Sequence, residues 1–293
     1  MSERELIDAG WYLDFDDTRY HGSGGVSSTS LKYLLQRAPN YFLCKQNQQN
    51  KPTEAMKMGS LVHTMILEPE TVKQKYVQCP EFGDLRKTAN KTAKLEFEER
   101  NQDKDAVKSE LYEKAERMAE SVLSHPTASL LLDGSINESS VYWWFKGDYE
   151  DERKYKQMCK VRPDAISTTH PGMIIDIKTT DDASFTGFAK SIHKFNYHLS
   201  AAMYLEGCNS NKELLDKTKA FIFTNFVWVV VEKEYPYNVA CYSMCKTDYN
   251  IGRMLFRKSM MVLHDAKEDN FPGYPEEIRE IELPAYAQKG HIV

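Results

Sequence analysis

The stretch 162–180, RPDAISTTHPGMIIDIKTT, limits the possible folds more than any other part of the chain. It predicts a strand that ends at Asp164, a polar turn, and a second, apolar strand over residues 173–177. If these strands pair antiparallel, Asp164 and Asp176 meet across a hairpin although about a dozen residues separate them. The stretch therefore predicts a sheet that carries two carboxylates side by side.

Alternation along the second strand places Asp176 and Lys178 on one face of the sheet and Ile177 on the other. Carboxylate oxygens suit Mg²⁺ or Mn²⁺, and a neighbouring ammonium can orient a water molecule or stabilise charge on a phosphate oxygen. The alternative interpretation is a surface Asp-Lys ion pair and an aspartate in a Pro-Asp turn, without a further role. The rest of the chain has to distinguish the two.

Composition sets the class of protein. The 293 residues are 41% hydrophobic and 28% charged, an ordinary globular balance with ample material for a core. A polar start and the lack of a long apolar run predict a cytoplasmic protein with no membrane span. Six scattered cysteines predict reduced thiols rather than disulfides. With a net charge of −5, a DNA enzyme would have to concentrate its positive charge in a groove.

The first part of the chain predicts helices. Residues 1–25 are polar and predict a loose arm, and residues 26–293 predict a single domain that begins with a helical part. Serine and threonine side chains can cap a first helix, which ends near Pro39. A second helix, AMKMGSLVHTMILEPE, carries His63 among apolar neighbours. A histidine in such a place is either a core side chain or a ligand.

Residues 87–123 predict a long charged helical region with a break near Asp103. Its Lys87, Lys91 and Lys94 either line a DNA channel or form a solvated helix face. Strands are predicted at 141–147, 155–161, 173–177, 221–233 and 237–244, and further helices at 183–207 and 250–268. This order predicts an α/β (α+β) domain in which helices flank a mixed central sheet.

The spacing of the charged residues resembles a known signature. Asp164, an eleven-residue gap and Asp176-Ile177-Lys178 resemble the PD-(D/E)xK nuclease motif, which alone is loose. Further segments occur in a matching order: VSSTSLKYLLQRAPNYF, MGSLVHTMILEPE, CKVRPDAIS, IIDIKTT, YHLSAAMY, FVWVVVEKEYPYNVACY and FPGYPEEIREIELPAYA. Over nearly the whole chain this series resembles the nuclease domain of the exodeoxyribonuclease VIII family and its phage and prophage relatives.

The resemblance implies a catalytic centre. His63 matches a helical histidine that joins the metal site in the wider group, which includes the RecB-type nucleases. It would hold Mg²⁺, or Mn²⁺ in its place, together with Asp164, Asp176 and the carbonyl of Ile177. Lys178 would be the catalytic lysine.

Other matching positions carry less weight. Tyr204 matches the tyrosine of a Gln-x-x-x-Tyr element that contacts DNA, but Ser200 stands where the family has glutamine. Arg162 would contact phosphate or pair with an aspartate. Glu138 matches a glutamate that precedes the first core strand in relatives.

The function implied by the resemblance is that of a Mg²⁺-dependent exodeoxyribonuclease. It would degrade linear double-stranded DNA from 5′ ends without ATP and leave 3′ single strands for recombination by a phage annealing protein. A homo-oligomeric ring, with a tetramer favoured, would thread the duplex. The expected channel lining is Lys87, Lys91, Lys94, Arg162, Lys190 and Lys194, with the acidic turn 148–153 away from DNA. The alternatives are a catalytically silent DNA- or partner-binding module and a structure-specific endonuclease.

Overall fold

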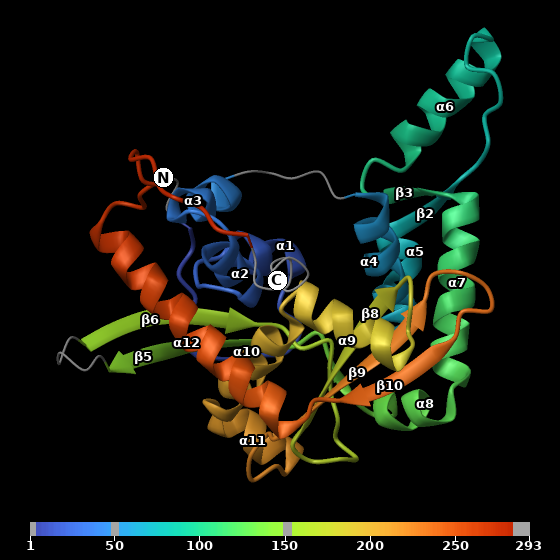
Figure 1. Ribbon diagram of the computed structural model, residues 1–293. Coiled ribbons are helices and arrows are strands. Elements are labelled where there is room, and N and C mark those ends of the chain that lie inside the picture. Colours follow the sequence, from blue (N-terminus) through green and yellow to red (C-terminus); the bar gives the residue numbers. More distant parts are fainter. Residues whose placement is uncertain (1–3, 48–52, 149–153, 284–293) are drawn as a thin grey trace, which may run out of the picture.

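The computed structural model describes residues 4–47, 53–148 and 154–283 (Figure 1). Its largest sheet is mixed and has the strand order β10-β9-β8-β7-β4. These strands are β4 (Ile136–Asn137), β7 (Ala165–Ile166), β8 (Met173–Thr180), β9 (Asn225–Glu232) and β10 (Val239–Ser243). A three-stranded antiparallel sheet consists of β1 (Gly10–Tyr12), β5 (Ser140–Asp148) and β6 (Lys154–Val161). β2 (Tyr76–Cys79) pairs in parallel with β3 (Asp105–Lys108).

Helices cover both faces of the largest sheet, so the predicted α/β class is confirmed. One face packs against residues of α4 (Glu54–Leu67), α5 (Val72–Lys75), α7 (Ser109–Ser124) and α8 (Pro126–Leu132). The other face packs against residues of α2 (Ser28–Gln36), α3 (Pro39–Asn47), α9 (Phe185–Lys194), α10 (Tyr197–Asn209), α11 (Lys212–Thr218) and α12 (Lys246–Glu268). A short 3-10 helix, η1 (Pro69–Thr71), connects α4 to α5.

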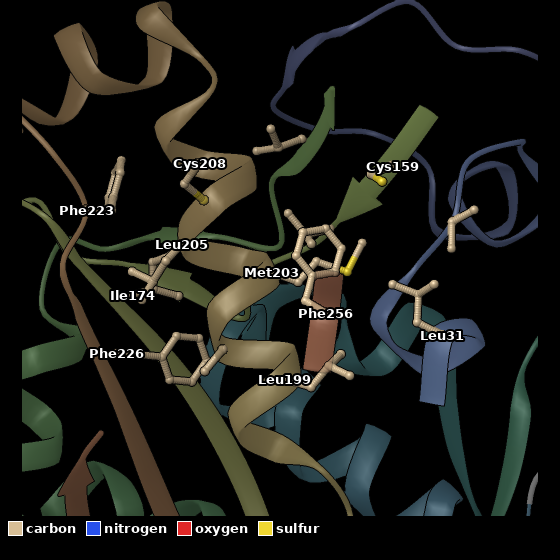
Figure 2. Packing of buried hydrophobic residues seen from close by; sticks show 14 of the residues in the cluster. Leu31, Cys159, Ile174, Leu199, Met203, Leu205, Cys208, Phe223, Phe226 and Phe256 are labelled. Atoms are coloured by element: carbon tan, nitrogen blue, oxygen red, sulfur yellow. The ribbon is translucent and has the colours of Figure 1, made fainter. Parts of the chain in front are cut away.

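The central strands divide their side chains between two cores. Ile174 and Phe226 belong to the core that contains Leu199 and Leu205 of α10 (Figure 2), whereas Ile175 of β8 belongs to the opposite core. Successive side chains of a strand point to opposite faces, and both faces are buried here. This explains why β8 and β9 are almost continuously apolar, and why a charged pair within β8 needs a specific explanation.

The predicted hairpin is present, but its first strand is short. β7 pairs antiparallel with β8, with Ala165 opposite Ile175. The strand expected to end at Asp164 is instead β6, which ends at Val161 and belongs to the other sheet. Pro163 has no backbone N–H to continue the β ladder, so the chain leaves one sheet and enters the next at this point.

The N-terminal segment is not a loose arm. β1 pairs with β5, and a short helix, α1 (Asp17–Gly22), follows it. Ile7 and Tyr20 are buried in a small core with Tyr142 and Met158. Aromatic contacts to distant residues order this segment, and local composition could not reveal them.

Two predicted helical regions are interrupted. Residues 87–123 contain α6 (Thr88–Arg100), then β3 and α7, so this region is broken close to Asp103 as predicted. The helix predicted at 183–207 is split into α9 and α10, which was not predicted. Asn196 separates the latter two in the left-handed conformation, which asparagine tolerates better than most residues. Helix α6 projects from the body of the molecule (Figure 1) and has no buried residue.

No helix in the described part of the chain is long and apolar enough to cross a membrane.

Candidate metal centre and active site

The hairpin brings the two predicted aspartates together. Because Ala165 lies opposite Ile175 in an antiparallel pair, the residue before Ala165, Asp164, comes opposite Asp176. The Ile177 backbone N–H donates a hydrogen bond of 2.7 Å to Oδ2 of Asp164. Asp164 therefore lies between β6 and β7, and this hydrogen bond holds its side chain against the backbone of β8, the strand that carries Asp176.

His63 reaches the same place from helix α4. Its Nδ1 lies 3.5 Å from Oδ2 of Asp164, and both side chains remain partly accessible. α4 packs against α7 and β8, which fixes the helix beside the hairpin. The structure therefore places His63 beside Asp164, at the rim of the apolar core.

Glu138 completes a cluster of possible ligands. Ligand atoms of His63, Glu138 and Asp164 lie within 4.8 Å of one another. The Glu138 N–H donates a 3.1 Å hydrogen bond to the Asp164 carbonyl, and its φ of 48° turns the chain just before β5. Burial, followed by the charge of Asp164, raises the pKa of Glu138 to about 8. Two carboxylates that lie this close together repel each other, and a divalent cation would offset that repulsion. The two carboxylates and the imidazole are therefore a suitable ligand set for such an ion.

Asp176 and Lys178 form an ion pair behind this cluster. Nζ of Lys178 lies 2.5 Å from Oδ2 of Asp176 and donates a 3.1 Å hydrogen bond to the Ile177 carbonyl. Burial raises the pKa of Asp176, although Lys178 opposes this shift. Burial also disfavours the Lys178 ammonium, but Asp176 and Asp164 outweigh it and raise the pKa of Lys178. Asp176 is thus held by Lys178 and lies outside the three-residue cluster, so shared binding of a cation by both aspartates requires Lys178 to shift.

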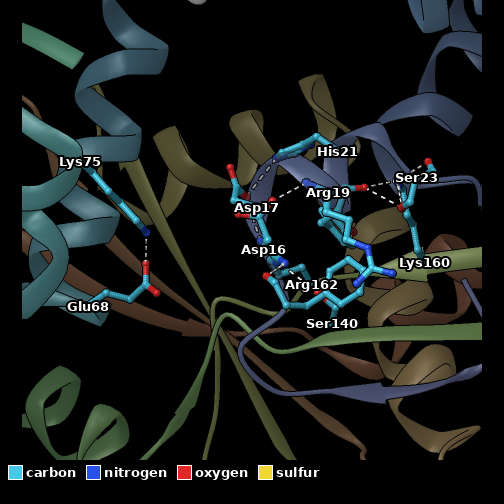
Figure 3. Close-up of polar contacts among 12 residues, drawn as sticks. Asp16, Asp17, Arg19, His21, Ser23, Glu68, Lys75, Ser140, Lys160 and Arg162 are labelled. Atoms are coloured by element: carbon cyan, nitrogen blue, oxygen red, sulfur yellow. Dashed lines mark hydrogen bonds and ion pairs between the residues drawn. The ribbon is translucent and has the colours of Figure 1, made fainter. Parts of the chain in front are cut away.

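Arg162 pairs with an aspartate, one of the two predicted alternatives, but the partner is Asp17 rather than Asp164 or Asp176 (Figure 3). Its guanidinium donates to Asp17 at 2.8 Å, to Ser140 at 2.9 Å and to the Phe15 carbonyl at 2.5 Å. The group also lies 4.4 Å from the centre of the Tyr20 ring. These contacts connect the N-terminal segment to the sheets. They use most of the N–H donors of Arg162, so few remain to bind a phosphate.

The two predicted positions on α10 differ in their surroundings. Tyr204 is half-buried, borders the cavity beside the metal cluster and has a raised pKa because of burial. Ser200 lies one turn earlier and is half-buried, but it does not border that cavity. The residue that departs from the family pattern is therefore set back from the cavity.

The cavity beside the cluster has a volume of about 1160 Å³. Its walls come from the N-terminal segment, the start of α2, helix α4 and residues 102–105. Carboxylates outnumber lysines and arginines among the described lining residues. Several of the cations are already engaged, as Lys160 is by Ser23 and Lys75 is by Glu68 (Figure 3). Such a cavity repels a phosphate backbone unless a bound cation reverses the local charge.

Sequence reasoning gave Glu138 little weight and missed the N-terminal wall of the cavity. Glu138 acquires its position from a backbone turn that depends on tertiary structure. Asp17 and Tyr20 lie in a segment that reads as polar and loose. The available signal was the aromatic content of residues 10–20, which is unusual for a flexible arm.

Comparison with known proteins identifies the family. The family described as "PDDEXK-like domain of unknown function (DUF3799)" matches residues 27–284. The chain belongs to this family.

One solved structure similar to this PDDEXK-like domain is that of a "Putative exonuclease" from Eubacterium rectale. The two share 12% sequence identity with a TM-score of 0.59, over 95% of this chain and 98% of the other. At this identity the likeness concerns the fold alone. A search of curated proteins found no match. The fold is thus that of the PD-(D/E)xK superfamily.

Proposed function

We propose that this PDDEXK-like domain is a metal-dependent exodeoxyribonuclease of the exodeoxyribonuclease VIII type. The observation that carries the proposal is the hydrogen bond from Ile177 to Asp164. It joins the His63-Glu138-Asp164 cluster to the Asp176-x-Lys178 pair in one continuous site. A site built only for stability would not place three carboxylates together beside an open cavity.

Each residue of the site would have a separate role in phosphodiester hydrolysis. His63, Glu138 and Asp164 would hold Mg²⁺, with Asp176 and the Ile177 carbonyl available from the strand. The bound cation supplies a Lewis acid for the phosphate and lowers the pKa of water. Lys178, released from Asp176, would orient the attacking water or stabilise charge on the phosphate. A P–O bond to water forms, the P–O3′ bond breaks, and the phosphate stays on the 5′ end of the shortened strand.

The proposed substrate is an end of linear double-stranded DNA, degraded 5′ to 3′ without ATP. The 3′ single strands that remain would serve recombination through a phage-type annealing protein. We also propose a homo-oligomeric ring, with a tetramer favoured, because a closed ring keeps its hold on a duplex. Lys87, Lys91 and Lys190 are exposed and available to such a channel. Most of the acidic turn 148–153 lies outside the described residues.

End-labelled DNA tests the proposal directly. Linear duplex and covalently closed circles are incubated with the protein and Mg²⁺, with Asp176→Asn as a matched control. We expect the linear form to disappear with early release of the 5′ label, and the circles to persist. Nicking of the circles would indicate an endonuclease, and intact DNA in both Mg²⁺ and Mn²⁺ would indicate a binding module.

A further inference from the structure

A second lysine lies next to the predicted one. Lys32 is on helix α2, and its Nζ lies 5.4 Å from the centre of the Tyr197 ring. Nζ of Lys178 lies 5.6 Å from the centre of the same ring. One aromatic side chain at the start of α10 is thus shared by two ammonium groups, one of which belongs to the Asp-x-Lys pair.

The Tyr197 ring is held firmly enough to position these cations. Phe195 stacks on it at 5.5 Å between ring centres, and the buried Phe188 lies at 6.2 Å. The face of an aromatic ring attracts a cation, and more strongly where water is excluded. Tyr197 can therefore limit where the Lys178 ammonium moves once Asp176 releases it.

Lys32 differs from Lys178 in lacking an anionic partner. Among the described residues, no carboxylate forms an ion pair with Lys32, whereas Lys178 has Asp176. Burial, followed by the charge of Lys178, lowers the pKa of Lys32 to about 8, while Asp176 opposes the shift. The ammonium is therefore within the electrostatic reach of the catalytic pair. A partly buried cation without a counter-charge is costly unless a ligand supplies one.

The position of Lys32 along α2 suggests which ligand that is. Ser28 and Thr29, one turn earlier on the helix, border the cavity beside the metal cluster. The even-numbered positions of β8, which include Asp176 and Lys178, face the side of the sheet on which α2 and α10 pack. Lys32 does not itself line the cavity, but it lies one turn beyond the cavity wall, on the same side of the sheet as Asp176 and Lys178 and opposite α4.

We propose that Lys32 is a second active-site lysine, which contacts a non-bridging oxygen of the DNA phosphate at the cleavage site, and that Tyr197 positions both lysines. The inference rests on the proposed nuclease function. When a cation occupies the carboxylates, Lys178 loses part of its hold on Asp176, and the two ammonium groups face the site without an anion. A phosphodiester restores the charge balance.

Binding measurements test the contact without relying on activity. Fluorescence anisotropy of a linear duplex is measured in Ca²⁺ over a range of salt for wild type, Lys32→Met and Lys32→Arg. The matched control is Lys258→Met, which changes an exposed lysine of α12 away from the cavity. We expect Lys32→Met to bind about tenfold more weakly, with a salt slope smaller by about 0.9, as for one lost phosphate contact. Lys32→Arg keeps the charge and should bind more tightly than Lys32→Met, and only the Lys258→Met control should behave as wild type.

Single-turnover cleavage in Mg²⁺ tests the role of the ring. Tyr197→Phe keeps the aromatic face and should cleave faster than Tyr197→Leu. Tyr197→Leu removes the aromatic ring and should cleave at least tenfold more slowly. Its affinity for DNA should fall no further than that of Lys32→Met. Equal rates for the two variants would overturn the positioning role of Tyr197.

The outcomes separate this inference from the proposed function. If wild type cleaves DNA and Lys32→Met binds and cleaves equally well, Lys32 is not an active-site residue although the nuclease proposal stands. If wild type neither binds nor cleaves DNA, the proposed function fails and the inference fails with it. Loss of an unpaired, partly buried charge should not unfold the protein, and thermal melting of Lys32→Met and Lys32→Gln checks this.

Discussion

Removal of the Glu138 charge should stabilise the metal-free protein. The folded environment raises the pKa of Glu138 from 4.5 to about 8, so the fold disfavours the ionised carboxylate. The penalty is absent below the unfolded pKa, grows as the pH rises from 4.5 to 8, and is constant above that. Each pKa unit corresponds to about 1.4 kcal/mol, which sets an upper limit of about 4 kcal/mol at pH 8. Because Glu138 borders an open cavity, water screens its charge in part, and we expect the ionised carboxylate to destabilise the fold by about 2 kcal/mol.

Glu138→Gln keeps the shape of the side chain and removes the charge. Denaturant unfolding in EDTA at pH 8 should give the variant a free energy of unfolding about 2 kcal/mol above that of wild type. Near pH 5 the difference should shrink, because most wild-type Glu138 is then protonated. The matched control is Glu113→Gln, an exposed change on α7, which should show no such pH dependence.

Divalent cations should reverse the order of stability. Wild type should bind the cation with its full ligand set, and at a hundredfold excess over Kd such binding would add about 2.7 kcal/mol. The variant, with a weaker site, should gain less, so Mg²⁺ or Mn²⁺ should raise the Tm of wild type above that of the variant. A Glu138→Gln protein that is no more stable than wild type in EDTA at pH 8 would refute the assignment of a strained carboxylate to this position.

Four other predictions concern the site and the assembly. Asp164→Asn, Asp176→Asn and Lys178→Ala should each lower DNA cleavage by at least a hundredfold while circular dichroism shows a folded chain. His63→Ala should be inactive in Mg²⁺ but partly active in Mn²⁺, which accepts imidazole nitrogen more readily; full activity in Mg²⁺ would make His63 a core residue. Ca²⁺ should support DNA binding without cleavage, and comparable cleavage rates in Ca²⁺ and Mg²⁺ would contradict this. Light scattering should show a mass well above the 33.9 kDa of one chain, and an active, processive monomer would exclude the ring.

The hairpin was predictable because its signals are local. Apolar residues run through 173–177, a polar turn precedes them, and the alternation of Asp176 with Lys178 needs no tertiary information. His63 was predictable only through resemblance, since its own helix reads equally well as a core helix. Its nearness to Asp164 results from the packing of α4 against the sheet, which periodicity does not specify.

The remaining features depend on contacts between distant residues. Tyr20 is ordered by Tyr142, more than a hundred positions away, so the polar composition around it predicted a loose arm. β3 consists of charged and small residues within a region of helical composition, and it forms because β2 offers a parallel partner. Lys32 looks like a surface lysine of an amphipathic helix until α10 brings Tyr197 over it.

The Asp176-Lys178 pair gives the site a defined metal-free state. Without a cation, Lys178 neutralises Asp176, so the buried carboxylate has a partner while Glu138 and Asp164 crowd their charges at the cavity. A cation bound by this crowded pair would relieve their repulsion and compete with Lys178 for Asp176. Under the proposed function, Lys178 would then be free to act on the phosphate only when the proposed ligands are occupied. The same two interactions would therefore couple the release of Lys178 to the binding of the ion.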